Sequence, residues 1–171
     1  IKTENTTTTG LGTLKIGEGK VTLDTNKKAF DNIYITSGRG ELALKQAEAL
    51  GATKNTNSAS GTTSANSYTL SQNKNSEMGF YFGKGGGKFD LAGNSLVLNT
   101  IAANDSGAII TSTSTTKATL EIQGLGYDSS GNKKITKENT IIHASIGDNT
   151  NGANGTNLNL IYKGDKTAAN R

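Results

Sequence analysis

The sequence of 171 residues contains no cysteine, no proline and no tryptophan, and aromatic residues make up only 5% of it. Without cysteine there are no disulfides, thiolate metal sites or cysteine nucleophiles. There is also no apolar run near the length of a membrane span and no signal-peptide pattern. Because the chain begins at Ile1 rather than Met, we interpret it as a fragment of a longer protein, whose targeting signals would lie elsewhere.

Charge of one sign is not concentrated anywhere in the chain. Lysine and arginine number 18 and aspartate and glutamate 14, for a net charge of +4. The basic residues are spread out, with short pairs such as Lys27–Lys28 and Lys133–Lys134. A nucleic-acid interface needs a basic stripe with interleaved aromatic residues, so we predict no nucleic-acid partner.

Hydrophobic residues are few, at 32%, and they are arranged in short alternating runs. A low apolar content fits either partial disorder or a narrow core to which many strands contribute a little. Alternation at period two is typical of half-buried strands, and it favours the second explanation. The runs are 13–16, 20–23, 32–35, 40–44, 79–82, 88–91, 95–98, 118–122, 140–146 and 157–162. One window, 41–50, has a helical pattern, although its first half also fits a strand.

An internal repeat indicates how the strands are organised. Segment 13–23 aligns with segment 88–98 without a gap, and the segments that follow them, 24–44 and 99–122, also correspond. This repeat predicts units of about four short strands each. The alignment places Leu14, Ile16, Val21 and Leu23 on Phe89, Leu91, Leu96 and Leu98. Hairpins and a parallel solenoid both produce short strands, but aliphatic inward positions and uneven turn spacing favour the solenoid.

Three polar stretches interrupt this pattern, at about 51–77, 124–139 and 147–157. They have few apolar residues, and we predict that they are loops inserted into the coil. The sequence therefore predicts an all-β chain, a right-handed parallel β-helix fragment that forms a single domain over residues 1–171.

The glycine-rich segment GKGGGK, residues 83–88, resembles a phosphate-binding loop. A Walker-type loop needs a glycine at position 82 and a hydroxyl residue at position 89, and phenylalanine occupies both. A strand follows rather than a helix, so no helix N-terminus is offered to an anion. We interpret the segment as a turn between strands.

Asp105-Ser106-Gly107 resembles the nucleophile segment of trypsin-like proteases, but its flanking residues differ from that motif. His143 is the single histidine, and it alternates with Ile142 and Ala144 as an ordinary strand residue would. A lone histidine also argues against a zinc site. The triad interpretation of Ser106 and His143 is therefore disfavoured.

Acidic residues do not cluster in the sequence, as Asp24, Asp90 and Asp105 illustrate. A carboxylate pair formed between stacked strands stays open as an alternative, because such a pair would suit a polysaccharide lyase or hydrolase. We predict no catalytic, cofactor-binding or metal-binding residue in this fragment, and no cofactor.

Four blocks of the sequence resemble one known family. They are GLGTLKIGEGKVTL (10–23), AFDNIYITSGR (29–39), FGKGGGKFDLAGNSL (82–96) and DSGAIITS (105–112). Their order and spacing are similar to the passenger β-helix of the serine protease autotransporters of Gram-negative bacteria, over roughly residues 10–123. The insertion at 51–77 and the weak match after 123 depart from that pattern.

The resemblance implies a β-helix stalk in a protein that is secreted or held at the cell surface by outer-membrane autotransport. The catalytic motifs of the family are not in this fragment, so the fragment itself is not expected to be an enzyme. The expected partners are the flanking domains of the same polypeptide, with host protein or glycan as an alternative if the loops make the chain an adhesin or toxin module. The chain itself is not expected to be embedded in a membrane.

Overall fold

The computed structural model describes residues 12–27, 29–30, 32–50, 52–54, 67–70, 80–98, 101–122, 125–127, 133–135, 142–147 and 157–162. The strands are β1 (Thr13–Leu23), β2 (Asn32–Leu44), β3 (Ala52–Lys54), β4 (Ser67–Leu70), β5 (Phe80–Phe82), β6 (Gly87–Asp90), β7 (Ser95–Leu98), β8 (Ala102–Thr111), β9 (Ala118–Ile122), β10 (Leu125–Tyr127), β11 (Lys133–Ile135), β12 (Ile142–Ile146) and β13 (Leu158–Tyr162). A 3₁₀ turn, η1 (Ala47–Leu50), follows β2. No helix in these ranges is long and apolar enough to cross a membrane.

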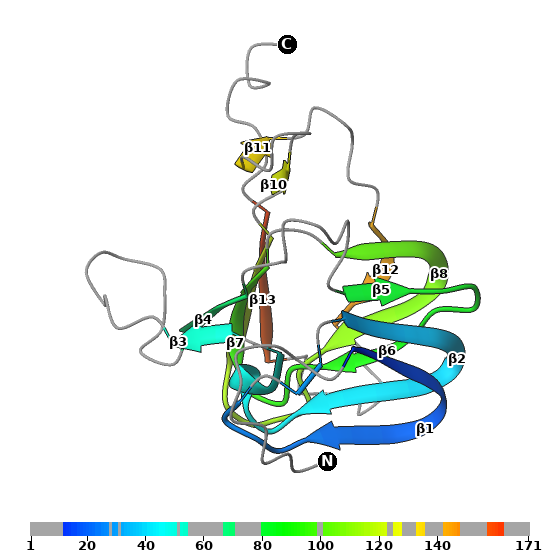
Figure 1. The fold of residues 1–171 in the computed structure, drawn as a ribbon, viewed down its shortest axis with the longest axis horizontal. Helices are drawn as coiled ribbons and strands as arrows, with labels where there is room; N and C mark the ends of the chain where they lie inside the picture. Colours follow the sequence, from blue (N-terminus) through cyan, green and yellow to red (C-terminus); the bar gives the residue numbers. More distant parts are fainter. Residues whose placement is uncertain are drawn as a thin grey trace.

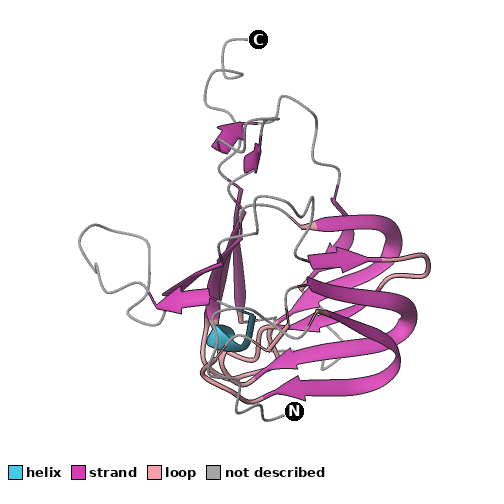
Figure 2. Ribbon diagram, viewed as in Figure 1, coloured by secondary structure: helices cyan, strands magenta, loops and turns pink. Residues whose placement is uncertain are grey.

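The strands form two main sheets on opposite sides of the core (Figures 1 and 2). The first sheet has the order β1-β2-β5-β8-β12, and β6 pairs with both β2 and β8. The second has the order β13-β9-β7-β4-β3. Pairing in the first sheet is parallel, as in β1 with β2 and β6 with β8. In the second sheet β4, β7, β9 and β13 are parallel, and β3 is antiparallel to β4.

Successive passages of the chain around the core stack as rungs, which repeat about every 4.8 Å along a β-solenoid. Rung 1 contains β1, rung 2 contains β2 and β4, and rung 3 contains β5, β6 and β7. Rung 4 contains β8 and β9, and rung 5 contains β12 and β13. The predicted all-β fold, a parallel β-helix, is confirmed.

The first sheet bends at a corner, so each long strand lines two faces of the core (Figure 1). Between rungs 1 and 2 the pairing moves from Ile16 with Ile35 to Glu18 with Arg39. Rung 2 therefore has a longer corner than rung 1, whereas β2 keeps one register with β5 and β6. A corner tolerates such differences because its extra residues point away from the core.

The core consists of columns of inward side chains, one from each rung. Rung 3 supplies the largest of them, since Phe80, Phe82 and Phe89 are fully buried. The ring centroids of Phe80 and Phe89 are 4.4 Å apart. Above and below Phe89, the paired strands place Ile110 and Leu42, both fully buried. The inward positions predicted for segment 88–98 are confirmed, because Phe89, Leu91, Leu96 and Leu98 are all fully buried.

The predicted internal repeat is wrong in register. The structure stacks residues 18–23 on 39–44, and residues 41–43 on 88–90, so segment 13–23 does not occupy the place of segment 88–98. Segment 13–23 is one bent strand, whereas 88–98 passes from β6 through a turn to β7. Likewise 32–44 is one strand, whereas 99–122 holds β8 and β9. The alternation of apolar and polar residues shows which side chains face inward. It does not distinguish a bend within one strand from a turn that leads to another sheet, because both leave the same spacing between apolar residues.

Two of the three predicted loops contain strands, which corrects their description as loops throughout. Segment 51–77 contains β3 and β4, and β4 stacks in parallel on β7 as a member of rung 2. Segment 124–139 contains the antiparallel pair β10–β11. Apart from Gly147 and Asn157, segment 147–157 lies outside the described residues. In window 41–50 the first half is strand, and only residues 47–50 form a helical turn.

Replacing Phe89 with alanine is expected to lower the free energy of unfolding by about 3–5 kcal/mol, because the lost ring would leave a cavity between rungs. The adjacent change Lys88→Ala, on the outer face, is expected to cost less than about 0.5 kcal/mol. Urea denaturation of the purified variants measures both values. Equal losses would contradict the assignment of inward and outward faces.

Candidate functional site

Buried polar side chains gather around the turn that joins β6 to β7, residues 90–94, which we call the Asp90 turn. They are Asp90, Ser95, Thr111 and Ser112, each 1–3% exposed. Buried polar atoms need hydrogen-bond partners to offset the loss of water. The pattern of those partners shows what the turn does.

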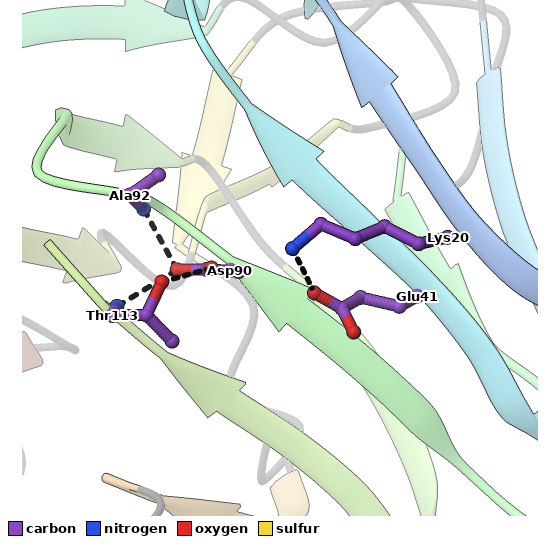
Figure 3. A network of polar contacts seen from close by, with 5 residues as sticks. All are labelled: Lys20, Glu41, Asp90, Ala92 and Thr113. Atoms are coloured by element: carbon purple, nitrogen blue, oxygen red, sulfur yellow. Dashed lines mark hydrogen bonds and ion pairs between the residues drawn. The ribbon is translucent and has the colours of Figure 1, made fainter.

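Asp90 joins the turns of rungs 3 and 4 (Figure 3). Its Oδ1 accepts hydrogen bonds from the backbone N–H groups of Ala92, at 2.9 Å, and Thr113, at 3.0 Å. Its Oδ2 accepts one from the Thr113 hydroxyl at 2.5 Å. Two neighbouring turns are therefore held by one carboxylate.

Asn94 extends the network to rung 2. Its side-chain amide donates to the carbonyl of Leu44 at 3.2 Å and to the carbonyl of Leu91, in its own turn, at 2.8 Å. The backbone N–H of Gly93 donates to the Ser112 hydroxyl at 2.9 Å. The Asp90 turn consequently links three consecutive rungs through polar contacts.

Charged side chains on the outer face link the first rungs (Figure 3). Lys20 Nζ lies 2.8 Å from a carboxylate oxygen of Glu41, and Glu41 is in register with Lys88 on the next strand. The hydrogen bond to Glu41 raises the pKa of Lys20. Further ion pairs join rungs 1 and 2 on the same face: Arg39 with Glu18, and Lys45 with Asp24. Exposed pairs of this kind add little stability.

Segment 83–88 forms the corner between β5 and β6, as predicted, and its glycines are required by packing. Residues 85–87 all have positive φ, of 86°, 78° and 123°. A Cβ on Gly86 would lie 2.0 Å from the carbonyl carbon of Gly107 in rung 4, and one on Gly87 would lie 2.3 Å from the Ile35 side chain in rung 2. The neighbouring rungs therefore leave room only for glycine.

Three amides of this corner are occupied within the protein. Gly83 N–H donates to the carbonyl of Ile35 at 2.8 Å, and Gly86 N–H to the carbonyl of Gly83 at 3.0 Å. Gly85 N–H donates to Asp105 Oδ2 at 3.0 Å. A phosphate cradle needs such N–H groups for its ligand, so the geometry favours the turn over a phosphate site.

Asp105 occupies the corresponding corner of rung 4. Its Oδ1 accepts a hydrogen bond from Gly107 N–H at 2.8 Å, in addition to the one from Gly85. These two hydrogen bonds hold the pKa of the Asp105 carboxyl below its usual range, and the charges of Lys84 and His143 act in the same direction. The carboxylate thus serves to close one corner onto the next.

Ser106 and His143 do not form a triad with Asp105. Both residues are exposed, and within the described residues no hydrogen bond joins them. A triad requires the base to contact the nucleophile and the acid to orient the base. His143 lies on the outer face of β12, as expected of an ordinary strand residue.

The three acids named from the sequence have different environments. Asp24 pairs with Lys45, Asp90 is buried in its turn, and Asp105 closes a corner. In the described part of the chain, no group of three or more histidine, aspartate or glutamate side chains could hold a metal ion.

Sequence reasoning missed the role of Asp90. The available signal was an aspartate two residues before Ala92-Gly93-Asn94, because aspartate commonly accepts a hydrogen bond from the backbone N–H two residues later. The contact between Asp90 and Thr113 leaves no such pattern in the sequence, because it forms only when rung 4 stacks on rung 3.

Comparison with known proteins identifies relatives of this coil. The chain is 40% identical over 121 residues to the serine protease EspP of Escherichia coli, a match that covers 71% of the chain and 7% of that protein. It is 32% identical over 137 residues to the serine protease EspC of Escherichia coli O127:H6, covering 80% of the chain and 8% of that protein. It is 29% identical over 164 residues to an adhesion and penetration protein autotransporter of Haemophilus influenzae, covering 89% and 10%.

The chain is a relative of the serine protease autotransporters. The resemblance noted in the sequence is thereby confirmed. The chain spans only 6–10% of the length of the autotransporters that it matches. No protein-family model and no solved structure matches it. The likeness to autotransporters supports a secreted or surface-exposed location reached through the outer membrane.

Replacing Asp90 with alanine is expected to lower the free energy of unfolding by about 1–3 kcal/mol, because three donors, on half-buried Ala92 and exposed Thr113, would lose their charged acceptor. Asp90→Asn is the matched control, since its oxygen still accepts from the two N–H groups and its amide donates to the Thr113 hydroxyl. We expect it to cost about 1 kcal/mol or less. Chemical denaturation tests this, and similar losses for the two variants would count against the network.

Asp105 is expected to make stability depend on pH. Its pKa is lowered from 3.8 in the folded chain, so its contribution is present above that value and is lost as the pH falls through the folded pKa. Asp105→Asn should therefore be less stable than the parent chain at about pH 6, and the difference should shrink as the pH falls below 3.8 and through the lowered pKa of the folded chain. Urea titrations across this range measure it. Ser106→Ala serves as a control, and a difference for Asp105→Asn that is constant with pH would refute the assignment.

Proposed function

We propose that this chain is a stalk segment of an autotransporter passenger, whose role is to space and present other parts of the same polypeptide outside the cell. The likeness to autotransporters supports the coarser statement, a surface-exposed passenger fragment. The stalk role rests on one structural observation. Asp90, Ser95 and Ser112, which are buried around the Asp90 turn, each accept a hydrogen bond from a backbone N–H group of a neighbouring rung, and these bonds hold adjacent rungs together.

A stalk needs stiffness and length rather than a reaction centre. Stacked rungs supply both, because each rung pairs along its backbone with the rungs on either side. The flanking parts of the polypeptide are the partners that this role requires. We propose no catalytic activity for the segment, because Asp105, Ser106 and His143 lack the contacts of a triad.

A second proposal, a host-binding adhesin or toxin module, is favoured by one finding. A relative from Haemophilus influenzae is an adhesion and penetration protein, and its match covers 89% of the chain. In this alternative, the stretches around 51–77 or 124–139 contact host protein or glycan. A polysaccharide lyase or hydrolase is less favoured, because Asp24, Asp90 and Asp105 bond to separate partners.

The stalk proposal predicts that stacking assists export. Leu91 is fully buried in the core, and a charge there would disrupt the stack of rungs 2–4. Leu91→Asp in the full-length passenger is expected to slow its appearance on the cell surface, whereas Lys15→Asp, on the exposed face, should have no effect. Surface labelling over time measures the rate, and unchanged kinetics for Leu91→Asp would sink the idea.

The adhesin alternative is separated from the stalk by a deletion confined to residues 55–66. The deletion spares β3 and β4, so rung 2 keeps its strand in the second sheet. If the segment is only a stalk, the passenger should bind host cells to the same extent with and without the deletion. If the segment is an adhesin that acts through this stretch, the passenger should lose host-cell binding although it is still displayed.

A further inference from the structure

Two tyrosine side chains stack on each other on the outer face of the first sheet. Tyr34 of β2 and Tyr81 of β5 are direct partners in the parallel register of rungs 2 and 3. Their ring centroids are 4.7 Å apart, and their ring planes are tilted by 36°. Both residues are half-buried, between inward neighbours that are fully covered. Among the described residues, this is the one ring contact between two tyrosines.

The hydroxyl end of the Tyr34 ring reaches from rung 2 to rung 3. A Cβ on Gly83 would lie 3.0 Å from the Tyr34 hydroxyl oxygen and 3.3 Å from the ring carbon that bears it. Gly83 follows Tyr81 by two residues, on the same outer face of rung 3. The absence of a side chain at Gly83 therefore leaves room for the hydroxyl end of Tyr34 beside the rung that carries Tyr81.

Phenol rings held in this way have the geometry for oxidative coupling. A one-electron oxidant removes one electron and one proton from each phenol, which leaves two phenoxyl radicals. A bond then forms between two ring carbons, each next to a hydroxyl-bearing carbon, and the hydrogens on those carbons move to the oxygens to restore two phenols. The chain loses two hydrogen atoms in total, and these reduce one hydrogen peroxide to two water molecules.

We propose that Tyr34 and Tyr81 form an oxidative cross-linking site, at which a peroxide-dependent one-electron oxidant joins the two rings into dityrosine. The bond ties rung 2 covalently to rung 3. The site depends only on the geometry of the two rings, and it is independent of the stalk role.

Composition and location both favour this chemistry. Cysteine and tryptophan are other side chains that one-electron oxidants attack readily, and the sequence has neither, whereas it has five tyrosines. The likeness to autotransporters supports a location outside the cell, where conditions are oxidising and covalent cross-links are commonly formed and kept. Stacking by itself also stabilises neighbouring strands, but phenylalanine would serve that purpose equally well. A test must therefore depend on the phenol groups.

The proposal is tested by oxidising the dilute 171-residue chain with a haem peroxidase and hydrogen peroxide. We expect a monomer that is lighter by two hydrogen atoms and has the fluorescence of dityrosine. Trypsin should then release residues 29–39 joined to residues 75–84, which mass spectrometry identifies. In urea that unfolds the chain, the yield of this linked pair should fall at least about tenfold, because the two phenols are no longer held together.

Four variants separate the cross-link from simple packing. Tyr34→Phe and Tyr81→Phe keep both rings but remove one phenol, so each should abolish the linked pair. Gly83→Ala keeps both phenols, and it should lower the yield because the added methyl group displaces the Tyr34 ring. Tyr162→Phe, at an exposed tyrosine of rung 5, should leave the yield unchanged. Urea denaturation before oxidation shows that each variant is folded.

Three results would overturn the proposal. They are a folded parent chain that gives no linked pair, a yield that is the same in urea, and a yield that rises with protein concentration. The last would mean that the phenols couple between chains rather than between rungs. An unchanged yield for folded Gly83→Ala would contradict the position assigned to the Tyr34 ring.

Discussion

The structure depends on one constraint, which is that no rung can bury its inward side chains without a neighbour. A strand of four or five residues has too little surface to form a core alone, so burial comes from columns such as Leu42, Phe89 and Ile110, contributed by three rungs. The low hydrophobic content follows directly, because only alternate residues of narrow strands face inward. The large side chains of rung 3 fill the middle of this stack, where cover is complete on both sides.

Polar side chains provide hydrogen-bond partners for the backbone groups of the turns. Wherever the chain leaves one face of the coil for another, backbone N–H and carbonyl groups lose their partners in the sheet. Asp90, Asn94 and Asp105 supply those partners, and each reaches into an adjacent rung to do so. Residue types that often carry chemistry are used here for support. This is why a sequence with many asparagines, serines and glycines can build a stacked coil.

The autotransporter relatives share only a small part of their length with this chain, which suits a modular coil. Because each rung contacts only its neighbours, a coil can be lengthened or interrupted without disturbing distant rungs. The hairpin β3–β4 and the pair β10–β11 show such interruptions within one short segment.

The sequence by itself determined the fold class, the inward faces of most strands and the glycine corner at residues 83–88, because alternation and glycine reflect local geometry. It also carried the likeness to autotransporters. Only the tertiary structure decided the register of the rungs, the strands within segments 51–77 and 124–139, and the contact between Asp90 and Thr113. These features depend on backbone pairing between residues far apart in the chain, and such pairing leaves no periodic trace in the sequence.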